Sequence, residues 1–162
     1  PAGFLSMTGA FDRIGDTGFM IKIISQSEQQ TRALAKVLAK KLKGGEILAL
    51  SGSLGSGKTT FVKGLAKSLG IKKPILSPTF VIFSRYPIRH PSARYLYHFD
   101  LYRLAHPREL RQLGFSELCQ TPENICVVEW AEKAEGLMPK RKISIKFTHG
   151  QKPESRIIKI DG

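Results

Sequence analysis

One stretch restricts the possible folds more than any other, the octapeptide Gly52-Ser53-Leu54-Gly55-Ser56-Gly57-Lys58-Thr59. It matches G-x-x-x-x-G-K-[ST], the phosphate-binding loop of nucleotide hydrolases and kinases. The short apolar run 46–51 precedes it, as expected of a buried parallel strand, and an amphipathic run follows it. This strand–loop–helix context favours a nucleotide site over a glycine-rich turn that happens to precede a lysine.

The residue types of this loop suit phosphate binding. Its glycines allow the backbone to curl so that N–H groups point inward, and the following helix directs its positive end to the same place. We expect Lys58 to reach the terminal phosphates and the Thr59 hydroxyl to bind Mg²⁺. The predicted nucleotide-binding residues are Ser53, Leu54, Gly55, Ser56, Gly57, Lys58, Thr59, Thr60 and, further along the chain, Trp130.

Two acidic residues stand where predicted apolar strands end. Asp100 closes the alternating run 94–100, and Glu129 stands at the end of the buried run 124–130, just before Trp130. Parallel sheets bind ligands at the carboxyl ends of their strands, and a nucleotide hydrolase needs a carboxylate there for Mg²⁺. Both are therefore candidate metal ligands. The alternatives are a structural cap for Asp100 and a buried ion pair or surface acid for Glu129.

Three further residues are candidates with competing structural readings. Thr79, after Pro78, suits a loop that senses the terminal phosphate, but it equally suits capping of a turn. His98 precedes the proposed metal acid and either positions water or phosphate, or is a packed strand histidine. Trp130, the only tryptophan, lies under the nucleotide or packs in the core.

The remaining pattern predicts the fold class. Residues 20–24 suggest an edge strand, Ser27 and Gln30 a capping box for a helix reaching residue 43, and residues 81–83 with Tyr86 another strand. A short helix is expected over 106–113. Residues 142–147 and 156–160 alternate strictly and predict a C-terminal antiparallel hairpin. Together they indicate an α/β, P-loop NTPase-like three-layer sandwich with a mixed sheet.

Length and composition set the domain organisation and the cellular setting. The 162 residues suit one domain over 21–162, after a flexible lead-in or tag over 1–20. We expect no signal peptide and no membrane span. Cys119 and Cys126 form no metal-binding pattern and are expected to be reduced thiols in a cytoplasmic protein. The net charge of +13 suits nucleic acid, nucleotides or an acidic protein as partners, or serves only solubility.

Four motifs, taken together, resemble one family. They are residues 51–61 around the loop, Ser77-Pro78-Thr79-Phe80, the run 98–104 (HFDLYRL) and Val128-Glu129-Trp130. In this order and spacing they resemble the bacterial TsaE (YjeE) ATPase family, which serves threonylcarbamoyladenosine synthesis on tRNA. The resemblance extends from about residue 23 to residue 160.

The resemblance implies a small P-loop ATPase that uses ATP and Mg²⁺. It implies two protein partners, the threonylcarbamoyl transferase subunit and its dimerisation partner (TsaD and TsaB type), with tRNA reached through that complex. By motif match, Lys58 and Thr59 hold the phosphates and Mg²⁺, and Thr79 is the switch-like residue. Asp100 and Glu129 are then the acids of the metal and water site, with Trp130 beside them.

Two other classes of function fit the same residues. A small-molecule or nucleoside kinase would use the same loop with an arginine-rich lid, for which Arg85, Arg89 and Arg94 are candidates. A nucleotide-gated, non-catalytic adaptor would use the positive charge to bind RNA or protein. The partner-dependent ATPase, with low activity alone, is the function that we expect.

Overall fold

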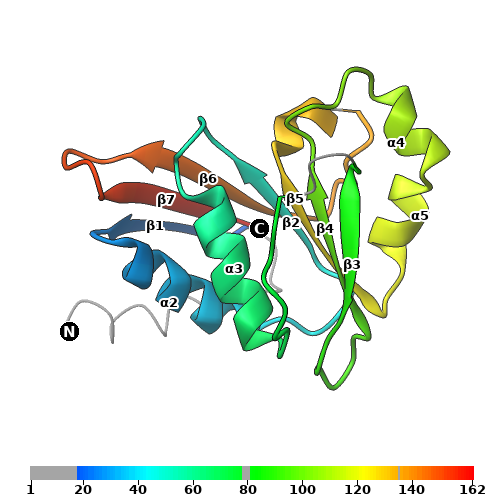
Figure 1. Cartoon of the computed structure of the whole chain (residues 1–162), viewed down its shortest axis with the longest axis horizontal. Coiled ribbons are helices and arrows are strands. Elements are labelled where there is room, and N and C mark those ends of the chain that lie inside the picture. The colour runs from blue at the N-terminus through cyan, green and yellow to red at the C-terminus, as the bar shows by residue number, and fades with distance from the viewer. Residues whose placement is uncertain (1–17, 78–80, 135) are drawn as a thin grey trace.

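The fold is known from a computed structural model, which describes residues 18–77, 81–134 and 136–162. They form one seven-stranded sheet with helices on both faces (Figure 1). In chain order the elements are β1 (Met20–Ser25), α2 (Glu28–Ala39), β2 (Ile47–Ser51), α3 (Lys58–Ser68), β3 (Phe83–Pro87), β4 (Tyr95–Asp100), α4 (Arg108–Gln112), α5 (Phe115–Gln120), β5 (Asn124–Glu129), the 3₁₀ helix η2 (Ala131–Ala134), β6 (Ile143–His149) and β7 (Arg156–Asp161).

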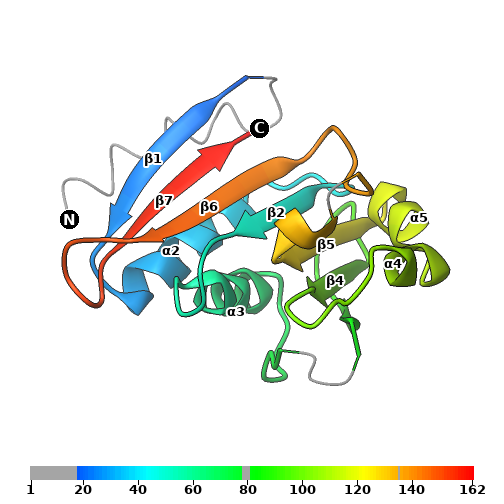
Figure 2. The same cartoon turned by 90° about the horizontal axis from the view of Figure 1, so that it is seen from above.

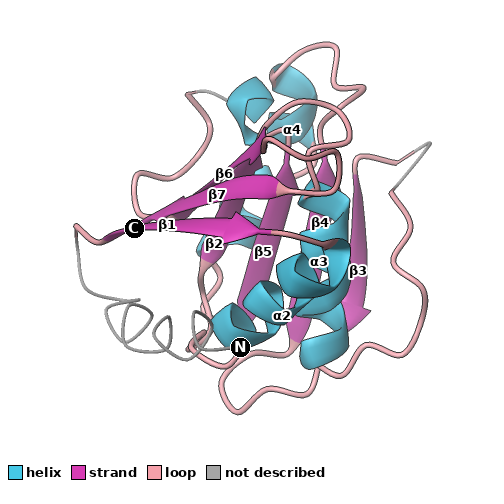
Figure 3. Ribbon diagram, turned by 90° about the vertical axis from the view of Figure 1, so that its left-hand side faces the viewer, coloured by secondary structure: helices cyan, strands magenta, loops and turns pink. Residues whose placement is uncertain are grey.

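The sheet has the strand order β1-β7-β6-β2-β5-β4-β3 and consists of two halves (Figure 3). Strands β6, β2, β5 and β4 are parallel to their neighbours in this series. Strand β3 is antiparallel to β4, and β7 is antiparallel to both β1 and β6. The predicted mixed sheet, edge strand and C-terminal hairpin are confirmed.

Alternation along the central strands builds two cores, one on each face of the sheet. On β5, Ile125 and Val127 face the core beneath α2 and α3, while Cys126 and Val128 face the core beneath α4 and α5. Figure 2 shows the two helix pairs on different sides of the sheet. A strand that buries both faces is apolar throughout, as this one is. The predicted three-layer α/β sandwich is therefore confirmed.

Helix α2 begins as the sequence predicts. The Ser27 hydroxyl accepts a hydrogen bond from the Gln30 backbone N–H at 3.2 Å, and the Gln30 side-chain carbonyl accepts one from the Gln26 N–H at 2.7 Å. These bonds occupy backbone donors that a helix start leaves unpaired. Leu34 and Leu38 then face the core, exposed by no more than 1%.

The structure differs from the sequence prediction at one strand and adds one helix. Strand β3 begins at Phe83 rather than at residue 81, and Val81 is 60% exposed. Helix α5 follows α4 directly, although no helix was predicted there, because Gly114 adopts a left-handed conformation (φ 69°) that ends one helix and starts the next. Its residues Phe115 and Cys119 are buried against the sheet.

The folded part begins before residue 21. Phe19 is only 5% exposed, its backbone hydrogen-bonds with Gly162, and β1 starts at Met20. The rest of the expected lead-in, residues 1–17, lies outside the described residues. Within the described ranges, no helix has both the length and the apolar composition that crossing a bilayer requires.

Candidate nucleotide-binding site

The loop between β2 and α3 depends on glycine for its shape. Gly52 has a φ of 139°, and a Cβ at this position would lie 2.4 Å from the Phe147 carbonyl oxygen of β6. Gly57, with a φ of 104°, is the residue from which α3 starts. A larger residue at Gly52 would collide with the neighbouring strand, so the loop can lie this close to the sheet only with glycine there.

Lys58 lies inside this loop rather than in solvent. It is 5% exposed, and its Nζ donates hydrogen bonds to the carbonyl oxygens of Gly52 at 2.7 Å and Ser53 at 2.9 Å. Its ammonium also lies 3.9 Å from the centroid of the Trp130 ring. Burial lowers the pKa of Lys58 from its ordinary value, and the carboxylates of Glu129, Glu132 and Asp100 act in the opposite direction.

The two predicted acids lie side by side. Asp100 and Glu129 are register partners at the carboxyl ends of the parallel strands β4 and β5. Residues at these positions share a face of the sheet, since side chains alternate with a period of two. The face is the one that carries α3, so both acids lie next to the phosphate-binding loop.

Glu129 is held by hydrogen bonds to both of its oxygens. It is 2% exposed; Oε2 accepts from Thr59 Oγ1 at 2.8 Å, and Oε1 lies 2.8 Å from His98 Nε2. The predicted metal ligands Thr59 and Glu129 are therefore in direct contact. Because the pair with His98 is buried, the carboxylate can change its position little.

His98 is both packed and positioned toward the site. Its side chain is fully buried on β4, and Nε2 contacts Glu129, while Nδ1 has no hydrogen-bond partner among the described residues. The two sequence readings, a packed strand histidine and a site residue, do not exclude one another. The histidine orients the acid rather than facing the cavity.

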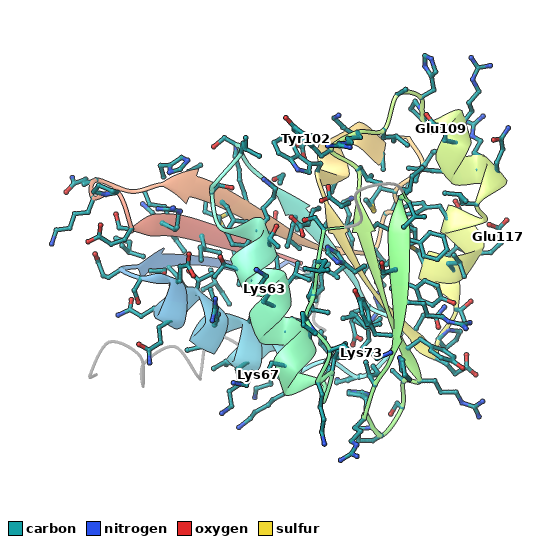
Figure 4. All side chains as sticks on the ribbon, in the orientation of Figure 1. Lys63, Lys67, Lys73, Tyr102, Glu109 and Glu117 are labelled. Carbon is teal, nitrogen blue, oxygen red and sulfur yellow. The ribbon has the colours of Figure 1, made fainter. Side chains whose placement is uncertain are left out.

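Asp100 performs the capping role that was the alternative reading, with one of its oxygens. Oδ1 accepts a hydrogen bond from the Tyr102 backbone N–H at 3.0 Å. The residue also lines the cavity at the loop. Figure 4 shows Tyr102 at the edge of the sheet where β4 and β5 end.

Trp130 has an unusual backbone. Its φ of 59° is the one positive value recorded for a non-glycine among the described residues. Such a conformation costs about 1–2 kcal/mol for an L-residue, and it is found where the surroundings impose it. The turn directs the indole over Lys58 and against Tyr102, with ring centroids 5.1 Å apart. The ring thus forms a wall of the site, where core packing was the default expectation.

A cavity of about 620 Å³ joins these groups. The lining residues that the sequence predicted are Leu54, Gly55, Ser56, Gly57, Lys58, Thr59, Thr60, Asp100, Glu129 and Trp130. Ser53 contributes its carbonyl oxygen to Lys58 instead. Thr79 lies outside the described residues, although Ser77 and Val81, on either side of the undescribed stretch, line the cavity.

Arg156 was not among the site residues predicted from the sequence, yet it contacts the loop. Its Nη2 donates to the Gly55 carbonyl oxygen at 3.1 Å, and its Nη1 donates to the carbonyls of Pro153 at 2.6 Å and Ser155 at 2.7 Å. It lies 101 residues from Gly55 in the chain. No local pattern signals this contact, because it arises only when β6 and β7 pair beside β2.

The arginines proposed for a kinase lid lie elsewhere. Arg85 packs over the Tyr95 ring at 4.8 Å, and Arg89 packs beside Gly70. Among the described residues, none of the three candidates Arg85, Arg89 and Arg94 lines the cavity; Arg103 and Arg156 are the arginines that do. The geometry therefore gives no support to that lid.

The chain is similar to known proteins over most of its length. The family model described as "Threonylcarbamoyl adenosine biosynthesis protein TsaE" matches residues 25–158. A protein of Treponema pallidum named tRNA threonylcarbamoyladenosine biosynthesis protein TsaE is 38% identical over 77% of this chain and 89% of its own length. Its namesake in Bacillus subtilis is 40% identical over 72% of this chain and 70% of its own length.

A solved structure is similar over the same region. The crystal structure of Bacillus subtilis YdiB superposes with a TM-score of 0.73 at 32% identity, covering 89% of this chain and 86% of that one. The family match includes the loop, both strand-terminal acids, all of β6 and the first three residues of β7. This chain is a member of the TsaE family.

Proposed function

We propose that this chain is an ATP-binding and ATP-hydrolysing subunit required for threonylcarbamoyladenosine modification of tRNA in the cytoplasm. It acts with the threonylcarbamoyl transferase and its dimerisation partner, of TsaD and TsaB type. The observation that carries the proposal is the contact between Thr59 of the loop and Glu129 of β5 at 2.8 Å, beside Lys58. A phosphate-binding loop with an acid held at its hydroxyl is the arrangement that nucleotide hydrolysis needs.

The residues present fit Mg²⁺. Thr59, Glu129 and Asp100 offer oxygen atoms, the ligands that this hard cation prefers. Within the described ranges, no group of three or more His, Cys, Asp or Glu side chains could hold a metal alone. Few protein ligands suit Mg²⁺, which keeps several waters and binds substrate phosphates. When bound, it would neutralise charge on the terminal phosphates.

Lys58 would exchange partners when ATP binds. Its two acceptors are backbone carbonyls of the loop, which carry only partial negative charge. Phosphate oxygens are stronger acceptors for an ammonium. Their negative charge would also oppose the lowering of the Lys58 pKa that burial causes. The lysine is thus held beside the site before the nucleotide arrives.

Glu129 would position the water or the metal shell for hydrolysis. His98 and Thr59 fix its two oxygens, so the acid is oriented in the protein without a ligand. Trp130 and Tyr102 would shield one side of the phosphates from solvent. An acid that is already oriented and a site that excludes water both favour catalysis, because the groups around the phosphates then need little rearrangement in the transition state.

The test is ATP hydrolysis by the purified protein, alone and with the transferase pair and tRNA. We expect slow turnover alone, strong stimulation by the complete mixture, and loss of both in Lys58→Ala. Fast turnover that is indifferent to the partners would contradict the proposal. ATP binding without any stimulation would instead favour a small-molecule kinase, which a panel of acceptor metabolites would identify.

A further inference from the structure

Three lysines form a row across the antiparallel half of the sheet. Lys22 of β1 is the register partner of Lys159 of β7, and Lys159 is in turn the partner of Lys146 of β6. Partner residues in antiparallel strands have Cα atoms about 4.5–5.5 Å apart, and their side chains share one face. The row therefore places three ammonium groups next to one another on the same side of the sheet.

This side faces away from α2 and α3. The three lysines are exposed, whereas their sequence neighbours Ile21, Ile145 and Ile160 are buried beneath the two helices. In Figure 2, α4 and α5 lie at the far end of the sheet, over β4 and β5. No described helix covers the outer face of β1, β7 and β6. We call the exposed residues of this face the lysine face.

Little negative charge balances the row. The other outward residues of the three strands are Met20, Ile24, Ser144, Thr148, Ile157 and Asp161. Asp161 is the one acid among them, and no ion pair joins it to a lysine in the described part of the chain. Lys142, just before β6, adds a further cation at one end.

The fold does not require this arrangement. Like charges directly opposite one another destabilise a sheet. A lysine on an edge strand can prevent pairing with other chains, which accounts for Lys22 on β1. It does not account for Lys159 and Lys146, because β7 and β6 are interior strands with both edges paired. A ligand with closely spaced negative charges would offset the repulsion.

We propose that the lysine face binds the phosphate backbone of RNA. Nucleic acids carry closely and regularly spaced negative charges, and lysines bind them by releasing counterions. The hydroxyl of Ser144, on the same face, is also a typical phosphate donor. The outward residues include no aromatic ring on which a base could stack. The face therefore binds phosphates without reading the sequence.

The composition favours RNA over an acidic protein as the occupant. Protein interfaces are depleted in lysine and enriched in arginine and aromatic residues. The outward residues of this face, in contrast, include three lysines but no arginine and no aromatic residue. Its apolar residues Met20, Ile24 and Ile157 flank the row instead of forming a centre. This makes Ile24, which is 54% exposed, a probe for a protein partner.

The inference goes beyond the proposed ATPase and does not depend on it. The nucleotide cavity lies at the carboxyl ends of β2, β4 and β5, on the face that carries α3. The lysine face belongs to the other side of β1, β7 and β6. Lys58→Ala should therefore abolish ATP turnover and leave RNA affinity unchanged. The ATPase proposal and the RNA-binding proposal can thus be refuted independently of one another.

The test compares two triple variants with the same change in charge. The first is Lys22→Gln, Lys146→Gln and Lys159→Gln in one chain. The control is Lys36→Gln, Lys63→Gln and Lys67→Gln, on the exposed sides of α2 and α3; Figure 4 labels Lys63 and Lys67 there. Affinity for a tRNA transcript is measured by fluorescence anisotropy over a series of KCl concentrations.

We expect the first variant to bind at least about tenfold more weakly at 0.1 M salt, with a salt slope reduced by about 2–3, since each phosphate contact contributes about 0.7–0.9. The control should change little. Equal losses in both variants, or none in the first, would overturn the proposal. So would wild-type RNA affinity in the first variant combined with weaker binding to the transferase pair in Ile24→Ser, because the face would then bind protein. Urea unfolding should show that the first variant is at least as stable as the wild type, since the repulsion has been removed.

Discussion

Substitutions of Glu129 can distinguish its contribution to folding stability from its contribution to ATP hydrolysis. It is 2% exposed and accepts or shares two hydrogen bonds of 2.8 Å, with Thr59 and His98. Glu129→Ala removes the acceptor from the buried His98 ring and from the half-buried Thr59 hydroxyl. Leaving a polar group without its acceptor in this way costs about 1–3 kcal/mol of the free energy of unfolding for each group.

Glu129→Gln is the informative variant, because it keeps the volume and one carbonyl acceptor. The amide can still bond with Thr59 or with His98, but it cannot replace a charged acceptor for both. We expect it to lose about 1–3 kcal/mol of stability, less than the alanine variant. Its ATP turnover should nevertheless fall at least tenfold, about 1.4 kcal/mol in the barrier, because the charge is gone.

The assays are urea unfolding for stability and ATP turnover in the presence of the transferase pair and tRNA for chemistry. Both variants are compared with the wild type at a temperature at which each is folded. Wild-type turnover in Glu129→Gln would show that the carboxylate has no role in hydrolysis. An alanine variant as stable as the wild type would show that the contacts with Thr59 and His98 contribute little.

Other predictions test neighbouring groups. Asp100→Ala should keep the fold and reduce ATP turnover at least about tenfold if its second oxygen serves the metal site. Because burial lowers the pKa of Lys58 in the folded state, the unfolded chain holds this proton to higher pH; the stability of the wild type relative to Lys58→Met should therefore rise with pH between the lowered pKa and 10.5, as measured by urea unfolding. Trp130→Gly should be about 1 kcal/mol more stable than Trp130→Ala, since only glycine adopts a φ of 59° at no steric cost. A hydrogen bond with Cys119, together with burial, raises the pKa of the Cys126 thiol, so both thiols should react with a disulfide reagent only after unfolding.

Each of these outcomes has a clear opposite. Full turnover in Asp100→Ala would leave that residue with its capping role alone. A pH-independent difference between the wild type and Lys58→Met would show that burial does not disfavour the charged lysine. Equal stability of the two Trp130 variants would mean that its backbone is unstrained. Rapid labelling of the native protein would show that the thiols are accessible.

Most local elements, and the candidate site residues that they carry, could be predicted from the sequence alone. The octapeptide 52–59 predicted a phosphate-binding loop, because glycines, a lysine and a threonine have strict roles at fixed spacing in such a loop. Asp100 and Glu129 were found because each ends an apolar run. The edge strand, the capping box at Ser27 and the C-terminal hairpin were equally readable, since alternation and capping depend on neighbouring residues alone.

Which of these elements lie side by side could be seen only in the folded structure. The strand order places β4, β5 and β2 side by side, and the register then aligns Asp100 with Glu129. Glu129 and Thr59 are 70 residues apart in the chain, and Arg156 and Gly55 are 101 residues apart. No local sequence pattern could therefore predict either contact. The lysine row likewise exists only through the register of three strands. Such contacts depend on how strands pair across the whole sheet, and that pairing is fixed by packing of the two cores rather than by any single segment.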